Sequence, residues 1–168
     1  MGYLHRWIFD DEKLRNNFFP KSFMKDVLEI LSDHLDILEL IKVDVSCLQF
    51  NGKEGYGFET FTFTSRGRGD CKTGGLFSVE EYDIVVTSVL LLAVFHLNAE
   101  LNCNGLATVF VNKETLEVSS YFEKALSYIE EKFGYTYSRQ LYIDEYDQER
   151  IRLIAIPLEA ENDVKSEV

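Results

Sequence analysis

The stretch that most constrains this chain is a run of apolar residues from Ile84 to Leu97, which only three polar residues interrupt. A helix that is apolar on every side must be surrounded by other elements. The run is shorter than the roughly 20 residues that a membrane-spanning helix needs, so it predicts a central buried helix. Ser78 and Glu81 have the spacing of a capping box, which places the start of this helix at Ser78.

The length and composition predict one globular domain over residues 1–160 and a charged, frayed tail over 161–168. Apolar residues make up 46% of the chain and aromatic residues 14%, which excludes a disordered chain. The net charge of −12 argues against binding DNA or RNA through the phosphates, because such binding needs a basic face. The same charge favours encounter with a basic partner.

Cysteine usage and the N-terminal residues predict a cytoplasmic protein. Cys47, Cys71 and Cys103 are odd in number and widely spaced, which is typical of reduced thiols. Acidic residues follow soon after Arg6, so the N-terminus does not have the pattern of a signal peptide. No histidine has metal-ligand spacing to a cysteine, and we expect neither a metal ion nor a cofactor.

The first half of the chain predicts a helix followed by a β-hairpin. From Pro20 to Asp36 apolar residues recur at spacings of three and four, which is typical of one buried helical stripe. That stripe comprises Met24, Val27, Leu28, Leu31 and Leu35. Apolar and polar residues then alternate from Ile41 to Cys47, as in a half-buried strand. A second alternating run, Tyr56 to Thr64, would pair with the first across the turn residues Asn51–Gly55.

Two other segments of the first half are less regular. Met1–Phe9 is rich in aromatic residues and fits either an edge strand or a short helix. Ser65–Gly75 predicts a flexible, glycine-rich loop. This loop lacks the glycine that a phosphate-binding loop has before its lysine, and its Arg68-Gly69-Asp70 tripeptide occurs often by chance.

The second half of the chain predicts a short strand, a helix and a hairpin. Leu106–Val111 is an apolar strand candidate. The helix begins near Ser119 or Ser120, where Ser120 and Glu123 have capping-box spacing, and it ends before Gly134. The hairpin strands are Gln140–Asp144 and Ile151–Leu158, and the acidic turn between them is Asp144–Glu149.

This order of elements predicts an α+β fold in two layers. A mostly antiparallel sheet would pack on helices, with one nearly fully buried central helix. An α/β sheet is the alternative, because strand–helix–strand units surround the central helix.

The sequence contains no recognisable catalytic signature. His96 and Cys103 could meet as base and nucleophile, but no orienting group accompanies them, and the end of a helix already suits His96. Glu80 and Glu81 are ordinary residues for a first helical turn. The acidic cluster Asp144–Glu149 lacks the spacing and the glycine of an EF-hand loop, so a solvated turn is the better interpretation.

Three features give the chain its overall character: the acidic segments Asp26–Asp44 and Asp144–Glu149, and the aromatic hairpin Tyr56–Thr64. In this character the chain resembles bacterial immunity proteins of polymorphic toxin systems, especially those that protect against contact-dependent growth inhibition toxins. The resemblance implies a small cytoplasmic protein, not an enzyme, that binds one toxin and occludes its active site. Many such toxins are basic nucleases, which suits the charge of −12. A small enzyme and an accessory subunit of a complex are the alternative functions.

Two surfaces are therefore the candidate binding sites for a protein partner, with neither nucleic acid nor membrane expected. The acidic turn offers Asp144, Glu145, Asp147 and Glu149. One face of the aromatic strand offers Phe58, Thr60, Thr62 and Thr64, which would form an edge able to accept another strand.

Overall fold

The structure is a computed structural model that describes residues 3–74, 80–108 and 112–158. The predicted cap at Ser78, the last part of the predicted strand (109–111) and the predicted tail (161–168) lie outside these ranges. No helix within the described ranges is long and apolar enough to cross a membrane.

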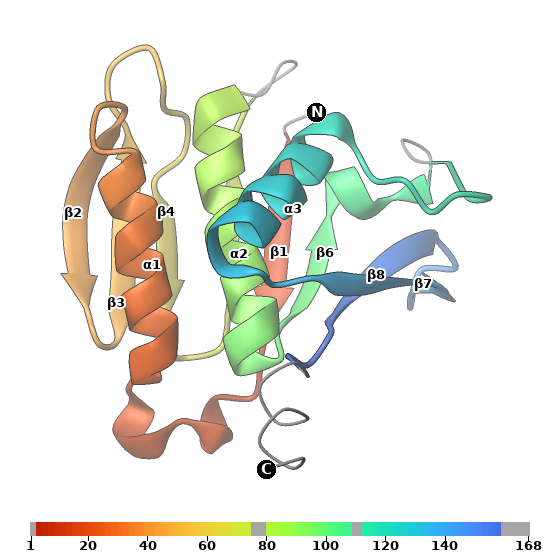
Figure 1. Cartoon of the computed structure of the whole chain (residues 1–168), viewed down its shortest axis with the longest axis horizontal. Helices are drawn as coiled ribbons and strands as arrows, with labels where there is room; N and C mark the ends of the chain where they lie inside the picture. Colours follow the sequence, from red (N-terminus) through yellow and green to blue (C-terminus); the bar gives the residue numbers. More distant parts are fainter. Residues whose placement is uncertain (1–2, 75–79, 109–111, 159–168) are drawn as a thin grey trace, which may run out of the picture.

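Strands and helices follow one another as Figure 1 shows. The strands are β1 (Leu4–Ile8), β2 (Leu38–Asp44), β3 (Cys47–Gly52), β4 (Phe61–Thr64), β5 (Arg68–Lys72), β6 (Glu100–Cys103), β7 (Tyr137–Ile143) and β8 (Glu149–Ala155). The α-helices are α1 (Lys21–Asp33), α2 (Glu80–Leu97) and α3 (Ser120–Phe133), and short 3-10 turns are η1 (Asp11–Lys13), η2 (Arg15–Asn17) and η3 (Asn104–Leu106).

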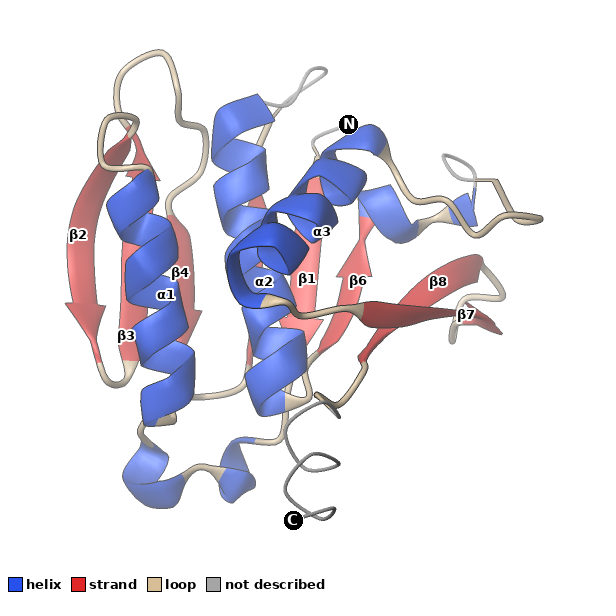
Figure 2. Cartoon of the chain, in the orientation of Figure 1, coloured by secondary structure: helices blue, strands red, loops and turns tan. Residues whose placement is uncertain are grey.

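The strands form three antiparallel groups, in the orders β5-β1-β6, β2-β3-β4 and β7-β8. Figure 2 shows the helices on one side of the strands, with the hairpin β7-β8 at one end of the molecule. Every strand ladder among the described residues is antiparallel, so the α+β prediction is confirmed and the α/β alternative is wrong.

Helix α2 is the centre of the core, as the apolar run predicts. From Tyr82 to Val94 every residue except Ile84 is buried. Helices α1 and α3 pack against α2, and the strands β6 and β8 also contact it. A helix with no polar face is stable here because each of its sides has a neighbouring element.

The buried face of α1 differs from the predicted stripe. Phe23, Val27, Ile30 and Leu31 are buried, but Leu28 is 49% exposed. The helix ends at Asp33, so Leu35 lies in the following turn and is 50% exposed. Spacings of three and four fit several neighbouring stripes of α1, and the stripe that contains Phe23 is the one that packs against the sheet.

The first hairpin is also placed differently from the prediction. A turn at Val45 and Ser46 divides the predicted strand Ile41–Cys47 and joins β2 to β3. The Asp44 carboxylate causes this turn, because its Oδ1 accepts hydrogen bonds from the backbone N–H groups of Ser46 and Cys47, both at 2.9 Å. The strand β3 then continues through the predicted turn as far as Gly52 and pairs with β4.

Two segments near the N-terminal half prove to be strands of one sheet. Of the two alternatives for the N-terminal segment, an edge strand and a short helix, the strand is correct. This strand, β1, lies between β5 and β6, however, and is not an edge. β5 lies within the segment Ser65–Gly75, where the loop prediction is wrong. Its glycine is compatible with a strand because Gly69 lies opposite Trp7, whose ring fills the space of a side chain.

The predicted strand Leu106–Val111 is wrong over its described part. Leu106 ends the 3-10 turn η3, and Ala107 forms a single β-bridge with Arg150. Helix α3 begins at Ser120 with Ser119 as the N-cap, whose Oγ accepts the N–H of Phe122, so the predicted box of Ser120 with Glu123 does not form.

Gly134 follows α3 with φ of 75°, as expected for a residue that ends a helix in the left-handed conformation. The hairpin β7-β8 confirms the two predicted strands of the C-terminal half, but β7 begins earlier, at Tyr137, and β8 ends earlier, at Ala155.

Candidate functional site

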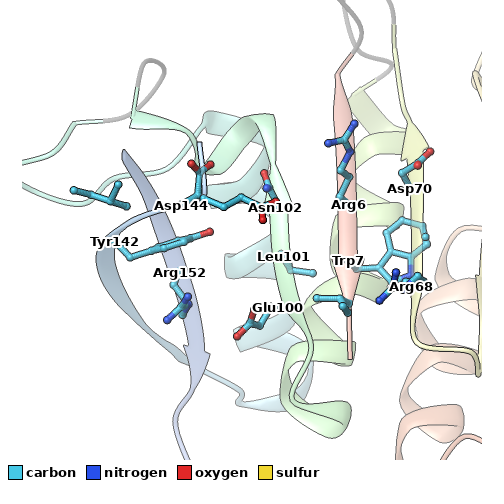
Figure 3. Close-up of a pocket in the computed structure, with 14 residues that line it drawn as sticks. Arg6, Trp7, Arg68, Asp70, Glu100, Leu101, Asn102, Tyr142, Asp144 and Arg152 are labelled. Atoms are coloured by element: carbon cyan, nitrogen blue, oxygen red, sulfur yellow. The ribbon is translucent and has the colours of Figure 1, made fainter. Parts of the chain in front are cut away.

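A groove of about 690 Å³ lies between the sheet β5-β1-β6 and the hairpin β7-β8 (Figure 3). Its floor is the sheet face that points away from α2, because His5 and Trp7 face the core while Arg6 and Ile8 are exposed. Half of the residues that line the groove are charged, and the lining includes residues from all five strands of the two groups.

The floor of the groove carries charges of both signs in register. Arg6 lies between Asp70 on β5 and Asn102 on β6. In the next row Ile8 lies between Arg68 and Glu100. Residues directly opposite each other in an antiparallel sheet point to the same face, so each row forms one band across the floor.

The hairpin forms the wall of the groove, and its base is fixed to the helices. Arg139 on β7 binds the Glu123 carboxylate of α3 through both terminal nitrogens, at 2.6 and 3.0 Å. The Arg139 guanidinium holds the pKa of Glu123 below its ordinary value. Facing the groove, the Arg152 guanidinium lies 4.3 Å from the centre of the Tyr142 ring, within cation–π distance.

The acidic turn at the tip of the hairpin contains two kinds of carboxylate. Asp144 Oδ1 accepts the backbone N–H groups of Tyr146 and Gln148, at 2.8 and 3.0 Å, and Arg150 Nε donates to Asp144 Oδ2 at 2.6 Å. Desolvation alone would raise the pKa of Asp144, but these hydrogen bonds, the one from Arg150 first, hold it below its ordinary value. Asp144 therefore shapes the turn.

Glu149 also has a partner within the chain, because its carboxylate forms an ion pair with Lys113. Glu145 and Asp147 differ from it, because they are exposed and form no ion pair with any residue that the structure describes. Sequence reasoning treated the four acids alike, and only Glu145 and Asp147 are available to a partner.

The aromatic candidate surface lies apart from the groove. Phe58 is 48% exposed in the loop before β4, so the predicted strand begins only at Phe61. Thr60 and Thr62 accept side-chain hydrogen bonds from β3, from Asn51 and Gln49 respectively, each at 3.3 Å.

The fourth residue of that surface, Thr64, is partly buried at the end of β4, and its Oγ1 accepts the N–H of Arg66 at 3.4 Å. β4 pairs with β3 on one side and contacts β5 on the other. β2 and β4 are both end strands of this group, and the contact with β5 leaves β4 less open to another strand than β2.

Buried polar groups elsewhere do not form an accessible site. His96 Nε2 lies 2.7 Å from Asp26 Oδ2, which also accepts the Tyr135 hydroxyl at 2.6 Å. Cys103 lies opposite His5 on the neighbouring strand, so the considered pair of His96 and Cys103 does not form. Within the described ranges no group of His, Cys, Asp and Glu is arranged to hold a metal ion.

His5 forms the most enclosed of these polar contacts. Its Nε2 lies 2.7 Å from Asp83 Oδ1, and neither side chain is exposed. With Cys103 beside it, the arrangement has the residue types of a nucleophilic triad. Cys103 is 1% exposed, so a substrate has no path to the sulfur.

Sequence reasoning missed the floor of the groove entirely. The alternation of Leu4–Ile8 was visible, but its exposed Arg6 gained meaning only when β5 and β6 were placed beside it. β5 was hidden in a glycine-rich segment that has no alternation. Comparison of the chain with known protein families, with curated proteins and with solved structures found no match.

Proposed function

We propose that this protein is an immunity protein, which binds a basic toxin, most simply a nuclease, and blocks the toxin's active site. In this proposal the protein acts by binding and not by catalysis, in the cytoplasm. The binding surface is the hairpin tip together with the groove beside it.

The observation that carries the proposal is the composition of the hairpin tip. Ile143 and Tyr146 are 67% and 69% exposed, more than the other exposed large apolar side chains of the described residues. Beside them lie the carboxylates of Glu145 and Asp147, which form no ion pair with a described residue. An exposed tyrosine next to an aliphatic side chain is typical of the centre of a protein interface, and surrounding acids select a basic partner.

The groove supports the same interpretation. Its volume would also suit a small molecule, but sites for small molecules are lined mainly by apolar side chains. Here the charged rows of the floor carry both signs, and Asp70 and Glu100 are their acidic members. Such a lining favours a charged loop of a protein.

The direct test is protection. The proposal expects a toxin gene directly beside the gene of this protein. The domain that this neighbouring gene encodes is expressed in a sensitive cell with and without this protein, and growth and toxin activity are measured. We expect growth to be restored and the purified pair to form a stable complex in which the toxin is inactive. Absence of protection and of a complex would refute the proposed function.

The binding surface is tested with matched pairs of variants. The double variant E145Q/D147N should weaken toxin affinity about tenfold or more, because it removes the two negative charges that would pair with basic residues of the toxin. E130Q/E131Q makes the same charge change at exposed positions of α3 and should leave affinity unchanged. Equal affinities of the two variants would exclude the tip as the contact.

The aromatic contribution is tested separately. Tyr146→Ala should cost about 2 kcal/mol of binding free energy if the ring is a central contact. Tyr56→Ala removes an exposed ring in the loop between β3 and β4 and serves as the control.

A further inference from the structure

We propose that two copies of this chain form a symmetric dimer by antiparallel pairing of their β2 strands, with the two α1 helices side by side above the joined sheet. This inference does not depend on the proposed function. The hairpin β7-β8 lies at the opposite end of the molecule from β2 (Figure 1), so both partner-binding tips would stay accessible in the dimer.

The first observation is an apolar outer strand. β2 pairs with β3 on one side and with no other strand of the described chain. Leu40 and Ile41, in the middle of β2, are 42% and 53% exposed. An exposed strand edge with apolar side chains is a template for another strand.

The second observation is that α1 has an exposed apolar flank on the same side. Asp26 of α1 contacts His96 of α2, and Asp33 contacts Lys132 of α3, at 2.7 and 2.8 Å. Leu28, two residues after Asp26, projects roughly 200° away around the helix and therefore away from α2. Leu35, in the turn that leads to β2, is exposed as well. In Figure 1 β2 lies on the side of α1 away from α2.

The third observation is that β2 is complementary to itself. Across a two-fold axis between residues 40 and 41, Glu39 of each copy lies opposite Lys42 of the other, and Leu40 lies opposite Ile41. A bulge at Ile41 makes this register possible. Within the chain, Glu39 lies opposite Asn51 of β3, and Lys42 lies opposite Gln49. Asn51 and Gln49 are two residues apart and share a face of the sheet, so the side chains of Glu39 and Lys42 also point to one face.

These observations favour a second copy over an unrelated strand. Lys42 and a bulge normally protect an edge against unspecific pairing. In the symmetric register both features become favourable, because Lys42 meets Glu39 and the two bulges face each other. The one ion pair of Lys42 with a described residue is a contact of 3.6 Å with Asp44, and both side chains are well exposed. One symmetry operation would also cover Leu28, Leu35, Leu40 and Ile41 of both copies.

The test is the molar mass of the full chain in solution by light scattering and sedimentation over a wide range of concentration. We expect a concentration-dependent species of twice 19.5 kDa. The variants E39K and K42E should each raise the dimer dissociation constant about tenfold or more, because each creates two pairs of like charges. E131K, which reverses an exposed charge on α3, is the control and should dimerise as the unaltered chain does.

The decisive arm is a mixture of the two variants. In a heterodimer of E39K with K42E every lysine again faces a glutamate, so the mixture should dimerise more tightly than either variant alone. Circular dichroism of each variant shows whether the fold is intact. A monomer at all concentrations, unaltered dimerisation of E39K and K42E, or a mixture that behaves like its separate components would each overturn the proposal.

Discussion

At the scale of single residues, the contact between His5 and Asp83 is the most unusual feature of the interior. Asp83 Oδ1 accepts from Thr73 at 2.5 Å as well as contacting His5, while His5 Nδ1 has no hydrogen-bond partner among the described residues. Burial lowers the pKa of the imidazole, but neighbouring Cys103 and hydrogen-bonded Asp83 together raise it to about 10. We infer that the pair is ionic at neutral pH and joins β1 to α2.

This pair predicts a pH-dependent stability. The pKa of His5 rises from 6.5 in the unfolded chain to about 10 in the folded chain, so the stabilisation is complete below pH 6.5 and is lost as the pH rises towards 10. Urea unfolding at intervals between pH 6 and 10 should show a decline in the free energy of unfolding that is smaller in His5→Gln. His34→Gln, at a partly exposed position, should keep the full decline; identical slopes for all three proteins would contradict the ionic pair.

A second residue-scale prediction tests the pair without a change of pH. Asp83→Asn leaves the buried imidazole without its carboxylate, and breaking a buried ion pair from one side costs about 3–5 kcal/mol. The free energy of unfolding, measured at pH 6, should fall by that amount. An unchanged value would show that Asp83 acts only as a neutral acceptor.

At the scale of elements, the sequence predicted α2 because its run of apolar residues has one interpretation. It predicted the existence of α1 and α3 from apolar residues at spacings of three and four, but it did not predict the buried side of α1. Leu28 fits the predicted stripe as well as Val27 does, and only the packing against the sheet distinguishes them. The strands β2 and β3 were misplaced because the turn between them depends on Asp44, in a stretch whose alternation continues through the turn.

The central position of α2 leads to a sharp prediction. Leu91 is fully buried, so Leu91→Asp places an unpaired carboxylate in the core. This change should lower the free energy of unfolding by about 3–5 kcal/mol. Leu158→Asp makes the same replacement where the side chain is 59% exposed and should change the melting temperature little. Equal melting temperatures of the two variants would contradict a buried α2.

The close packing of β1 against β5 leads to a second prediction at this scale. A Cβ atom at Gly69 would lie 2.5 Å from Cζ2 of the Trp7 ring, which packs against Phe61 and Phe63. Gly69→Ala should therefore destabilise the protein by about 1–3 kcal/mol through overpacking. The smaller ring of Trp7→Phe should reduce this cost in the double variant, which urea unfolding of all four proteins would measure as a non-additive effect.

At the scale of the whole molecule, the order of elements was enough to predict an antiparallel α+β fold around α2. The candidate site could be predicted only in part. The acidic turn was visible in the sequence, but the groove depends on β5, β1, β6 and the hairpin meeting in space. Which acids are available also depends on the fold, because Asp144 and Glu149 are occupied by partners that the sequence does not reveal.

If the proposed function holds, the net charge of −12 predicts how the protein meets its toxin. Many acidic side chains remain exposed, and Glu145 and Asp147 at the hairpin tip have no ion pair among the described residues. Attraction of a basic toxin should therefore accelerate association. Stopped-flow measurements should show the association rate constant falling clearly as salt rises from roughly 0.05 to 0.5 M, where exposed charges become screened. The dissociation rate should change less, because contacts around Tyr146 are screened little. An association rate that is indifferent to salt would remove the argument for a basic partner.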